Sequence, residues 1–173
     1  MKIITAPEKY ILEKGEISVF LAGGITDCPN WQNDIIERLR YLNTENLVVF
    51  NPRRENFPIH DPSASYKQIE WEFKALESAD IFSMYFSSGE SVQPICMYEL
   101  GRNLAKMQIK KPIDWEDRIV ISVEDGYKRK QDVLIQTELA CGCDSFVTTQ
   151  VSESVLRDYH AENIAKAYLK LIK

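Results

Sequence analysis

The chain has 173 residues and a formal net charge of -5, so it lacks the basic excess that proteins use to bind nucleic-acid polymers. No apolar run approaches the ~18 residues that a membrane span needs, and Pro7 and Glu8 interrupt the N-terminus too early for a signal peptide. We therefore expect one domain over residues 1–173, located in the cytoplasm, with neither a membrane nor a nucleic-acid polymer as partner.

The cysteines and histidines do not form a metal-binding pattern. Cys141 and Cys143 stand close together, but two thiols are too few for a structural zinc site. His60 and His160 show no ligand spacing with them. We expect reduced, mostly buried thiols, no metal and no cofactor.

Residues 1–15 have the pattern of a short extended segment and a turn, with an edge strand as one interpretation, and the first clear strand is expected over residues 17–22. That strand ends in Gly23, Gly24 and Ile25, where glycines allow a close backbone approach to a ligand. A plain strand-to-helix turn would need the same residues. The stretch is not GxGxxG, so the dinucleotide-binding fingerprint is absent.

A helix is predicted from residue 31 to about residue 43, with Asn30 as its N-cap, followed by a second buried strand over residues 47–50. This strand leads into Asn51, Pro52, Arg53 and Arg54. An amide and two guanidinium groups at a strand end suit a hydroxyl-rich or anionic ligand. The alternative is that the paired arginines are solvated or ion-paired.

A helix is expected over residues 66–78, where the apolar spacing predicts a core face made by Ile69, Phe73 and Leu76. Glu72 falls on an adjacent face, so it can border a site rather than point into bulk water. The alternative for Glu72 is a structural carboxylate paired with a nearby cation.

A third strand over residues 81–86 is followed by a polar loop and by a helix that opens near Pro94, just after Gln93. Glu99 lies just inside that helix, at the carboxyl end of a strand, where ligands bind in open α/β sheets. The helix N-terminus favours an ionised carboxylate, which can act as a nucleophile or base. An ordinary surface glutamate in a first turn is the alternative.

The remaining chain continues the alternation of strands and helices. We expect a connection over residues 106–117, a strand over 118–123, a helix from about 131, a strand over 144–148 and a helix over 152–172. Strands that alternate with helices predict an α/β fold with a parallel sheet and helices on both faces.

Four short motifs, in order along the chain, carry a family resemblance. They are Phe20-Leu21-Ala22-Gly23-Gly24-Ile25, Asn51-Pro52-Arg53-Arg54, Gln68-Ile69-Glu70-Trp71-Glu72 and Tyr98-Glu99-Leu100-Gly101. Together they resemble the nucleoside 2-deoxyribosyltransferase family, in its deoxyribosyltransferase-like branch. The resemblance implies a three-layer, flavodoxin-like or Rossmann-like fold with a five-stranded, mainly parallel sheet of order 2-1-3-4-5. It also implies a homo-oligomer that acts on a small-molecule nucleoside or nucleotide.

Members of that family cleave the N-glycosidic bond of 2'-deoxynucleosides. The resemblance implies that Glu99 attacks the anomeric carbon and forms a covalent 2-deoxyribosyl-enzyme, which a second base or water resolves. Glu72 matches a second family carboxylate, usually Asp, which handles a proton on the departing base or orients the sugar. This mechanism needs an ionised Glu99 and a Glu72 whose pKa is raised by partial burial. The expected substrate-binding residues are Gly23, Gly24, Ile25, Asn51, Arg53, Gln93 and Pro94.

Two departures from the family pattern leave the activity open. Phe20 stands where many members have a tyrosine that contacts the nucleophile, and Tyr85 and Tyr98 are the candidates to replace it. Gln93 stands where the family often has Asp or Ser, so the choice between a nucleoside and a 5'-monophosphate stays open. The alternatives to a deoxyribosyltransferase or hydrolase are a non-catalytic nucleotide-binding module and a hydrolase of another ribosyl compound.

Overall fold

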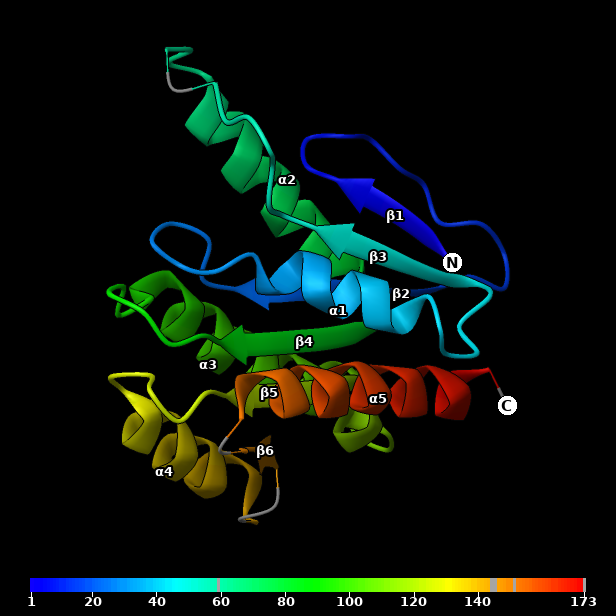
Figure 1. The fold of residues 1–173 in the computed structure, drawn as a ribbon. Coiled ribbons are helices and arrows are strands. Elements are labelled where there is room, and N and C mark those ends of the chain that lie inside the picture. Colours follow the sequence, from blue (N-terminus) through cyan, green and yellow to red (C-terminus); the bar gives the residue numbers. More distant parts are fainter. Residues whose placement is uncertain (59, 144–145, 151, 173) are drawn as a thin grey trace.

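A parallel β-sheet between two layers of helices forms the body of the protein (Figure 1). The structure, a computed structural model, describes residues 1–173 except 59, 144–145, 151 and 173. Its strands are β1 (Lys2–Thr5), β2 (Ile17–Gly23), β3 (Leu47–Asn51), β4 (Ile81–Phe86), β5 (Ile119–Val123) and β6 (Val147–Thr148). Its helices are α1 (Trp31–Leu39), α2 (Ala64–Ser78), α3 (Pro94–Lys110), α4 (Lys130–Cys141) and α5 (Glu153–Leu171), with a 3-10 turn, η1 (Trp115–Arg118).

The sheet order is β1-β3-β2-β4-β5-β6, and every described strand pair is parallel. This confirms the α/β class and the order 2-1-3-4-5 of the predicted strands. The sheet has one strand more than the five expected, because β1 pairs with β3 at its edge, which confirms the edge-strand interpretation of residues 1–15. The predicted last strand began at residue 144; residues 144 and 145 lie outside the described part of the chain.

Each strand contributes to two cores because its side chains alternate between the faces of the sheet. On one face, α1 and α5 cover residues such as Val19, Val49 and Val120. On the other face, α2, α3 and α4 cover residues such as Phe82 and Ile121. No helix in the described part of the chain is long and apolar enough to cross a membrane.

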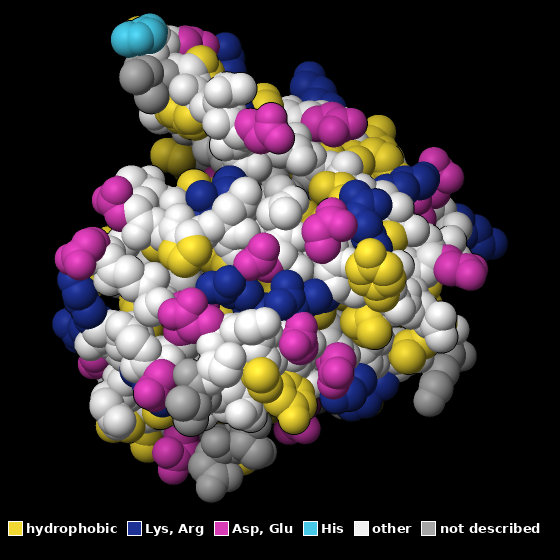
Figure 2. All heavy atoms as spheres, viewed as in Figure 1, with side chains coloured by type: hydrophobic (Ala, Val, Ile, Leu, Met, Phe, Trp, Pro, Cys, Tyr) yellow, Lys and Arg dark blue, Asp and Glu magenta, His cyan; other side chains and the backbone are white. Residues whose placement is uncertain are grey.

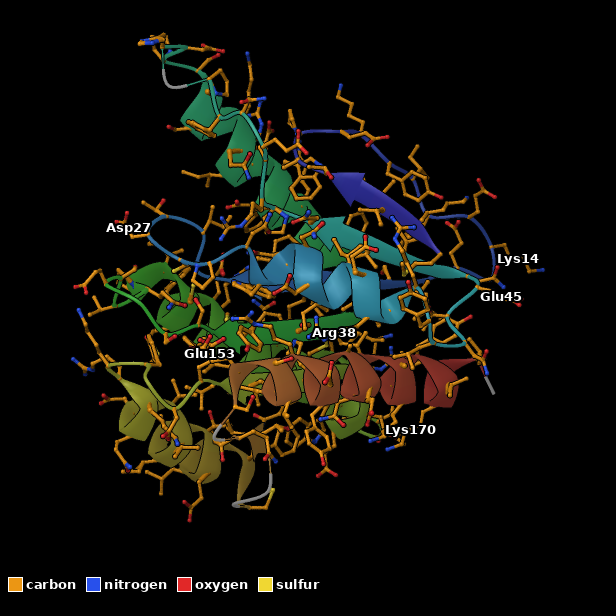
Figure 3. The ribbon with its side chains drawn as sticks, in the orientation of Figure 1. Lys14, Asp27, Arg38, Glu45, Glu153 and Lys170 are labelled. Atoms are coloured by element: carbon orange, nitrogen blue, oxygen red, sulfur yellow. The ribbon has the colours of Figure 1, made fainter. Side chains whose placement is uncertain are left out.

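The helices α1 and α5 also meet through charged side chains. Arg38 of α1 pairs with Asp158 of α5, and Arg157 of α5 pairs with Asp34 of α1 at 2.8 Å. Figure 2 shows a row of basic side chains flanked by acidic ones over these helices, and Figure 3 labels Arg38 where they meet. Because the chain brings both signs of charge here, this surface has no basic excess.

Polar side chains are buried between the sheet and α5. Ser83 and Ser122 lie on neighbouring strands, and their hydroxyl oxygens are each 2.7 Å from a ring nitrogen of His160. Glu124 follows β5 and accepts a hydrogen bond from Arg157 at 2.9 Å. Burial lowers the pKa of His160 to about 3, so the imidazole is neutral and exchanges hydrogen bonds with the two serines.

Three helices differ from their predictions, of which α1 ends at Leu39 and not near residue 43. In α2, Leu76 is buried as expected, but Ile69 is 64% exposed and Phe73 54% exposed. The N-terminal half of α2, which carries Ile69, projects beyond the sheet (Figure 1). Phe73 lies in the other half, but the buried face there is made by Ala75 and Leu76, and the guanidinium of Arg102 covers the ring of Phe73 at 4.7 Å from its centroid. In α3, the helix continues to Lys110 through residues expected to form a connection, because Met107 extends its buried stripe.

Candidate active site

A pocket of about 300 Å³ lies at the carboxyl ends of the central strands, next to α2 and α3. All of the predicted site residues except Asn51 and Arg53 line it. They are Gly23, Gly24, Ile25, Glu72, Gln93, Pro94 and Glu99. The structure thus brings the two predicted catalytic carboxylates, which come from different helices, into one cavity.

The packing of the chain itself requires the two glycines. A Cβ on Gly23 would lie 2.3 Å from the carbonyl oxygen of Tyr85 and 2.4 Å from the ring of Trp31. A Cβ on Gly24 would lie 2.4 Å from the Sγ of Cys28. These distances are too short for any non-bonded pair, so the neighbours, and not an approaching ligand, exclude a side chain here.

Gln93 joins the ends of two strands through its side-chain amide. Its Oε1 accepts a hydrogen bond from the backbone N–H of Gly24 at 3.1 Å, and its Nε2 donates to the carbonyl oxygen of Ser87 at 2.8 Å. Gln93 is buried and has a left-handed backbone, with φ of 46°, immediately before Pro94 starts α3. The amide therefore sets where the helix that carries Glu99 begins.

The two carboxylates form an electrostatically coupled pair. Burial and the nearby charge of Glu72 raise the pKa of Glu99 to about 7, against the opposing charge of Arg102. Burial also raises the pKa of Glu72, against a hydrogen bond of 2.8 Å from the Nε2 of Gln68 to its Oε1. The same Nε2 donates to the carbonyl oxygen of Pro52, which fixes Gln68 between β3 and Glu72.

The sequence argument for an ionised Glu99 is wrong in its physical cause. The helix begins at Pro94, so Glu99 lies beyond the first turn, which contains no acidic residue. The field of a helix N-terminus falls off within that turn. Burial and the second carboxylate act instead, and both favour the protonated form of Glu99.

The described structure offers Glu99 no tyrosine hydroxyl in place of the one missing at Phe20. Phe20 is buried against Trp71, with ring centroids 6.2 Å apart. The hydroxyl of Tyr85 donates to Glu124 at 2.6 Å, on the other side of the sheet. Tyr98 is 69% exposed.

Arg53 does not line the pocket, and its guanidinium is hydrogen-bonded to the loop that follows β2. Its Nε donates to the Oε1 of Gln32 at 2.8 Å, and its Nη2 donates to the carbonyl oxygens of Ile25 and Pro29 at 3.1 and 2.9 Å. Figure 3 labels Asp27 in this loop. Asn51 accepts from the backbone N–H of Arg53 at 3.0 Å, and both residues line a separate hollow.

Sequence reasoning missed several residues that line the pocket, namely Ala22, Thr26, Pro52, Ser91, Ile95 and Cys96. Of these, Cys96 is the one with a reactive side chain. It lines the pocket one helical turn before Glu99, a spacing that the sequence already contains. Burial raises the pKa of its thiol to about 12, so the thiol is neutral. The described residues include no group of three or more His, Cys, Asp or Glu that could hold a metal ion.

Comparison with protein families places the chain in a family. No curated protein matches the chain. A family model described as "Nucleoside 2-deoxyribosyltransferase like" matches residues 16–126, from the start of β2 through β5, which include every residue that lines the pocket. This match covers more than half of the chain, which therefore belongs to the nucleoside 2-deoxyribosyltransferase-like family.

Proposed function

We propose that the protein cleaves the N-glycosidic bond of a 2'-deoxynucleoside, or of its 5'-monophosphate, and passes the sugar to a second base or to water. The observation that carries the proposal is the placement of Glu99 and Glu72 in one pocket at the strand ends. Two carboxylates are the usual solution for a reaction that passes through an oxocarbenium-like state.

The coupling between the two carboxylates supports different roles for them, one as nucleophile and one as proton donor. Because the negative charge of Glu72 raises the pKa of Glu99, the pair retains a shared proton more readily than two isolated glutamates would. A pair that holds one proton has a carboxylate available as nucleophile and a carboxylic acid available as proton donor.

In the proposed reaction, the carboxylate oxygen of Glu99 bonds to the anomeric carbon as the bond from that carbon to the base nitrogen breaks. The base leaves with the bonding electrons and takes a proton from Glu72. Water or a second base then attacks the anomeric carbon, gives a proton to Glu72 and releases Glu99. The first step requires the shared proton on Glu72, whereas burial and the charge of Glu72 raise the pKa of Glu99. The charge of Arg102 opposes these two effects and favours the ionised form of Glu99.

The substrate contacts follow from the lining of the pocket. We assign Gly23, Gly24, Ile25 and Pro94 to contacts with the sugar or the base, since they line the cavity beside the carboxylates. Gln93 also lines it, but its amide is engaged by the backbone at both ends. Asn51 and Arg53 are left out of the proposed substrate site because they line the other hollow.

Chromatographic measurement of base release tests the proposal. The panel contains deoxyribonucleosides and ribonucleosides, each with and without a 5'-phosphate. We expect release from a deoxyribose substrate, loss of that activity in Glu99→Gln, and retention in Glu138→Gln, which changes an exposed glutamate on α4. Mass spectrometry of the denatured protein should find the sugar on the peptide that contains Glu99. An active Glu99→Gln variant would refute the assignment.

A second candidate function is a nucleotide-binding module without turnover. The observation that favours it is that no tyrosine hydroxyl reaches Glu99 in the described structure, since Phe20 replaces the usual residue and Tyr85 is committed to Glu124. Thermal stabilisation by nucleosides without base release over a long incubation would support this candidate. Release from ribonucleotides alone would instead indicate a hydrolase of another ribosyl compound.

A homo-oligomer remains part of the proposal. Apolar side chains on α2 and α3 are exposed beside the pocket, among them Ile69, Phe73, Ile95 and Tyr98. A second copy of the chain would remove this surface from water. Sedimentation velocity measures the oligomeric state directly.

A further inference from the structure

A second hollow, of about 610 Å³, lies at the carboxyl ends of β1 and β3 and runs along one face of α1, from Asn30 at its N-terminus to Arg40 at its C-terminus. It shares no lining residue with the carboxylate pocket. Its lining is rich in amide and guanidinium groups, contributed by Asn30, Asn33, Asn51, Arg40, Arg53 and Arg54. The volume lies within the range of cavities that hold small-molecule ligands.

Two of the lining arginines have no acidic partner among the described residues. The guanidinium of Arg53 donates only to neutral oxygens, namely the side chain of Gln32 and backbone carbonyls of the loop after β2. Arg54 lies over the ring of Phe57, 5.4 Å from its centroid, and forms no ion pair in the described part of the chain. Their positive charges are therefore not neutralised locally.

The lining acids do not cancel this charge. Glu37 is already paired with Arg40 at 3.2 Å, so these two side chains compensate one another. Glu55 is exposed to solvent at the hollow and forms no ion pair with Arg54 in the described part of the chain. The lining as a whole has three arginines and two glutamates, and the uncompensated charge lies at Arg53 and Arg54.

The polar groups of the hollow are mainly donors. The Oδ1 of Asn30 accepts from the backbone N–H of Asn33 at 3.3 Å, and the Oδ1 of Asn51 accepts from the backbone N–H of Arg53 at 3.0 Å. Both side chains therefore keep their NH2 groups for a ligand. The N-terminus of α1 adds the positive end of a helix dipole. Unpaired guanidinium groups, amide donors and a helix N-terminus together suit an anion.

We propose that this hollow is a binding site for a small molecule that carries a phosphate group, separate from the carboxylate pocket. The phosphate is held by Arg54, by the amide groups of Asn30 and Asn51, and by the N-terminus of α1. The carboxylate pocket is lined by Glu72 and Glu99 and by no lysine, arginine or histidine, so it offers no competing cationic side chain. The proposal does not depend on the catalytic activity.

Isothermal titration calorimetry of the full chain tests this site with three probes. They are inorganic phosphate, a deoxynucleoside 5'-monophosphate and the corresponding deoxynucleoside, at constant ionic strength. We expect the monophosphate to bind the hollow even when the phosphate-free deoxynucleoside saturates the carboxylate pocket. Binding by inorganic phosphate as tightly as by the monophosphate would identify free phosphate as the ligand; tighter binding of the monophosphate would identify a phosphorylated small molecule.

Variants locate the bound phosphate. Arg54→Gln removes an uncompensated charge and should weaken binding about tenfold, which corresponds to about 1.4 kcal/mol. Arg129→Gln is the matched control, because Arg129 is exposed, pairs with Asp132 and lies beside α4, on the other helical layer. Glu99→Gln should retain phosphate binding.

A second variant keeps the test informative if Arg54→Gln folds poorly. Asn33→Asp adds a negative charge in the first turn of α1, which stabilises the helix but repels an anion in the hollow. We expect it to fold and to lose phosphate binding. The proposal would be overturned if the unmodified protein did not bind phosphate. It would also be overturned if binding persisted in both hollow variants and was abolished when a deoxynucleoside filled the carboxylate pocket.

Discussion

Replacing Glu99 by glutamine should stabilise the fold at alkaline pH while it removes the proposed activity. Glu99 has an ordinary pKa of 4.5 in the unfolded chain and a pKa of about 7 in the folded protein. Between these values the folded state holds a proton that the unfolded state has released, so the stability of the unmodified protein falls as the pH rises through this window. Glutamine carries no charge and is free of this penalty.

The size of the effect follows from the difference between the two pKa values. A tenfold change in the acid dissociation constant corresponds to about 1.4 kcal/mol, so an ionised Glu99 destabilises the fold by up to about 3 kcal/mol above pH 7. Below the unfolded pKa the penalty disappears. We therefore expect Glu99→Gln to raise the free energy of unfolding at pH 8 by much more than at pH 5.

Urea unfolding at the two pH values measures this difference, provided that the slopes of the transitions are unchanged. The control is Glu138→Gln, since Glu138 is exposed on α4. If the free energy of unfolding of Glu99→Gln rose no more at pH 8 than at pH 5, the buried and coupled carboxylate pair would be ruled out. A more stable but inactive variant would instead mark Glu99 as a residue kept for function at the expense of stability.

Two further predictions concern packing and a buried imidazole. Gly24→Ala should lower the unfolding free energy by about 1–3 kcal/mol, because the new Cβ would meet Cys28 at 2.4 Å and Gln93 at 2.7 Å. The control is Gly101→Ala, whose Cβ meets nothing within 4 Å and should stabilise α3 slightly. Thermal melts compare the two variants. For His160, burial lowers the pKa to about 3, so stability should decline as the pH falls below 6.5, where the unfolded chain takes up the proton first. An NMR signal of this imidazole that titrated between pH 5 and 8 would contradict this prediction.

The sequence was sufficient to predict the central strands β2, β3, β4 and β5 because they are short apolar runs. Ile119–Val123 is buried along its whole length, as expected for a strand covered on both faces. Their alternation with helices then limits the order of the strands. The sequence also indicated that Glu72 and Glu99 lie near one site, since Glu99 follows a strand end and Glu72 lies on a helix face beside the core.

Long-range partners could not be predicted in the same way. The position of Arg53 after β3 indicates a cation near the ligand edge, but not that backbone carbonyls from Gly24 to Pro29 would engage it. The amide of Gln93 likewise finds its partners in two other loops. The exposed Ile69 shows a further limit, because apolar periodicity cannot reveal that half of α2 extends past the sheet.

The buried polar groups beneath α5 show that the end of the family match is not the end of the folded unit. The family match ends at residue 126, whereas α5 begins at Glu153 and supplies His160 and Arg157 to Ser83, Ser122 and Glu124 within the matched region. Without α5, each of these groups would lose a partner, at about 1–3 kcal/mol apiece wherever it stayed buried. The segment that defines the family is therefore smaller than the cooperative unit of this chain, and the helix that completes the unit lies outside it.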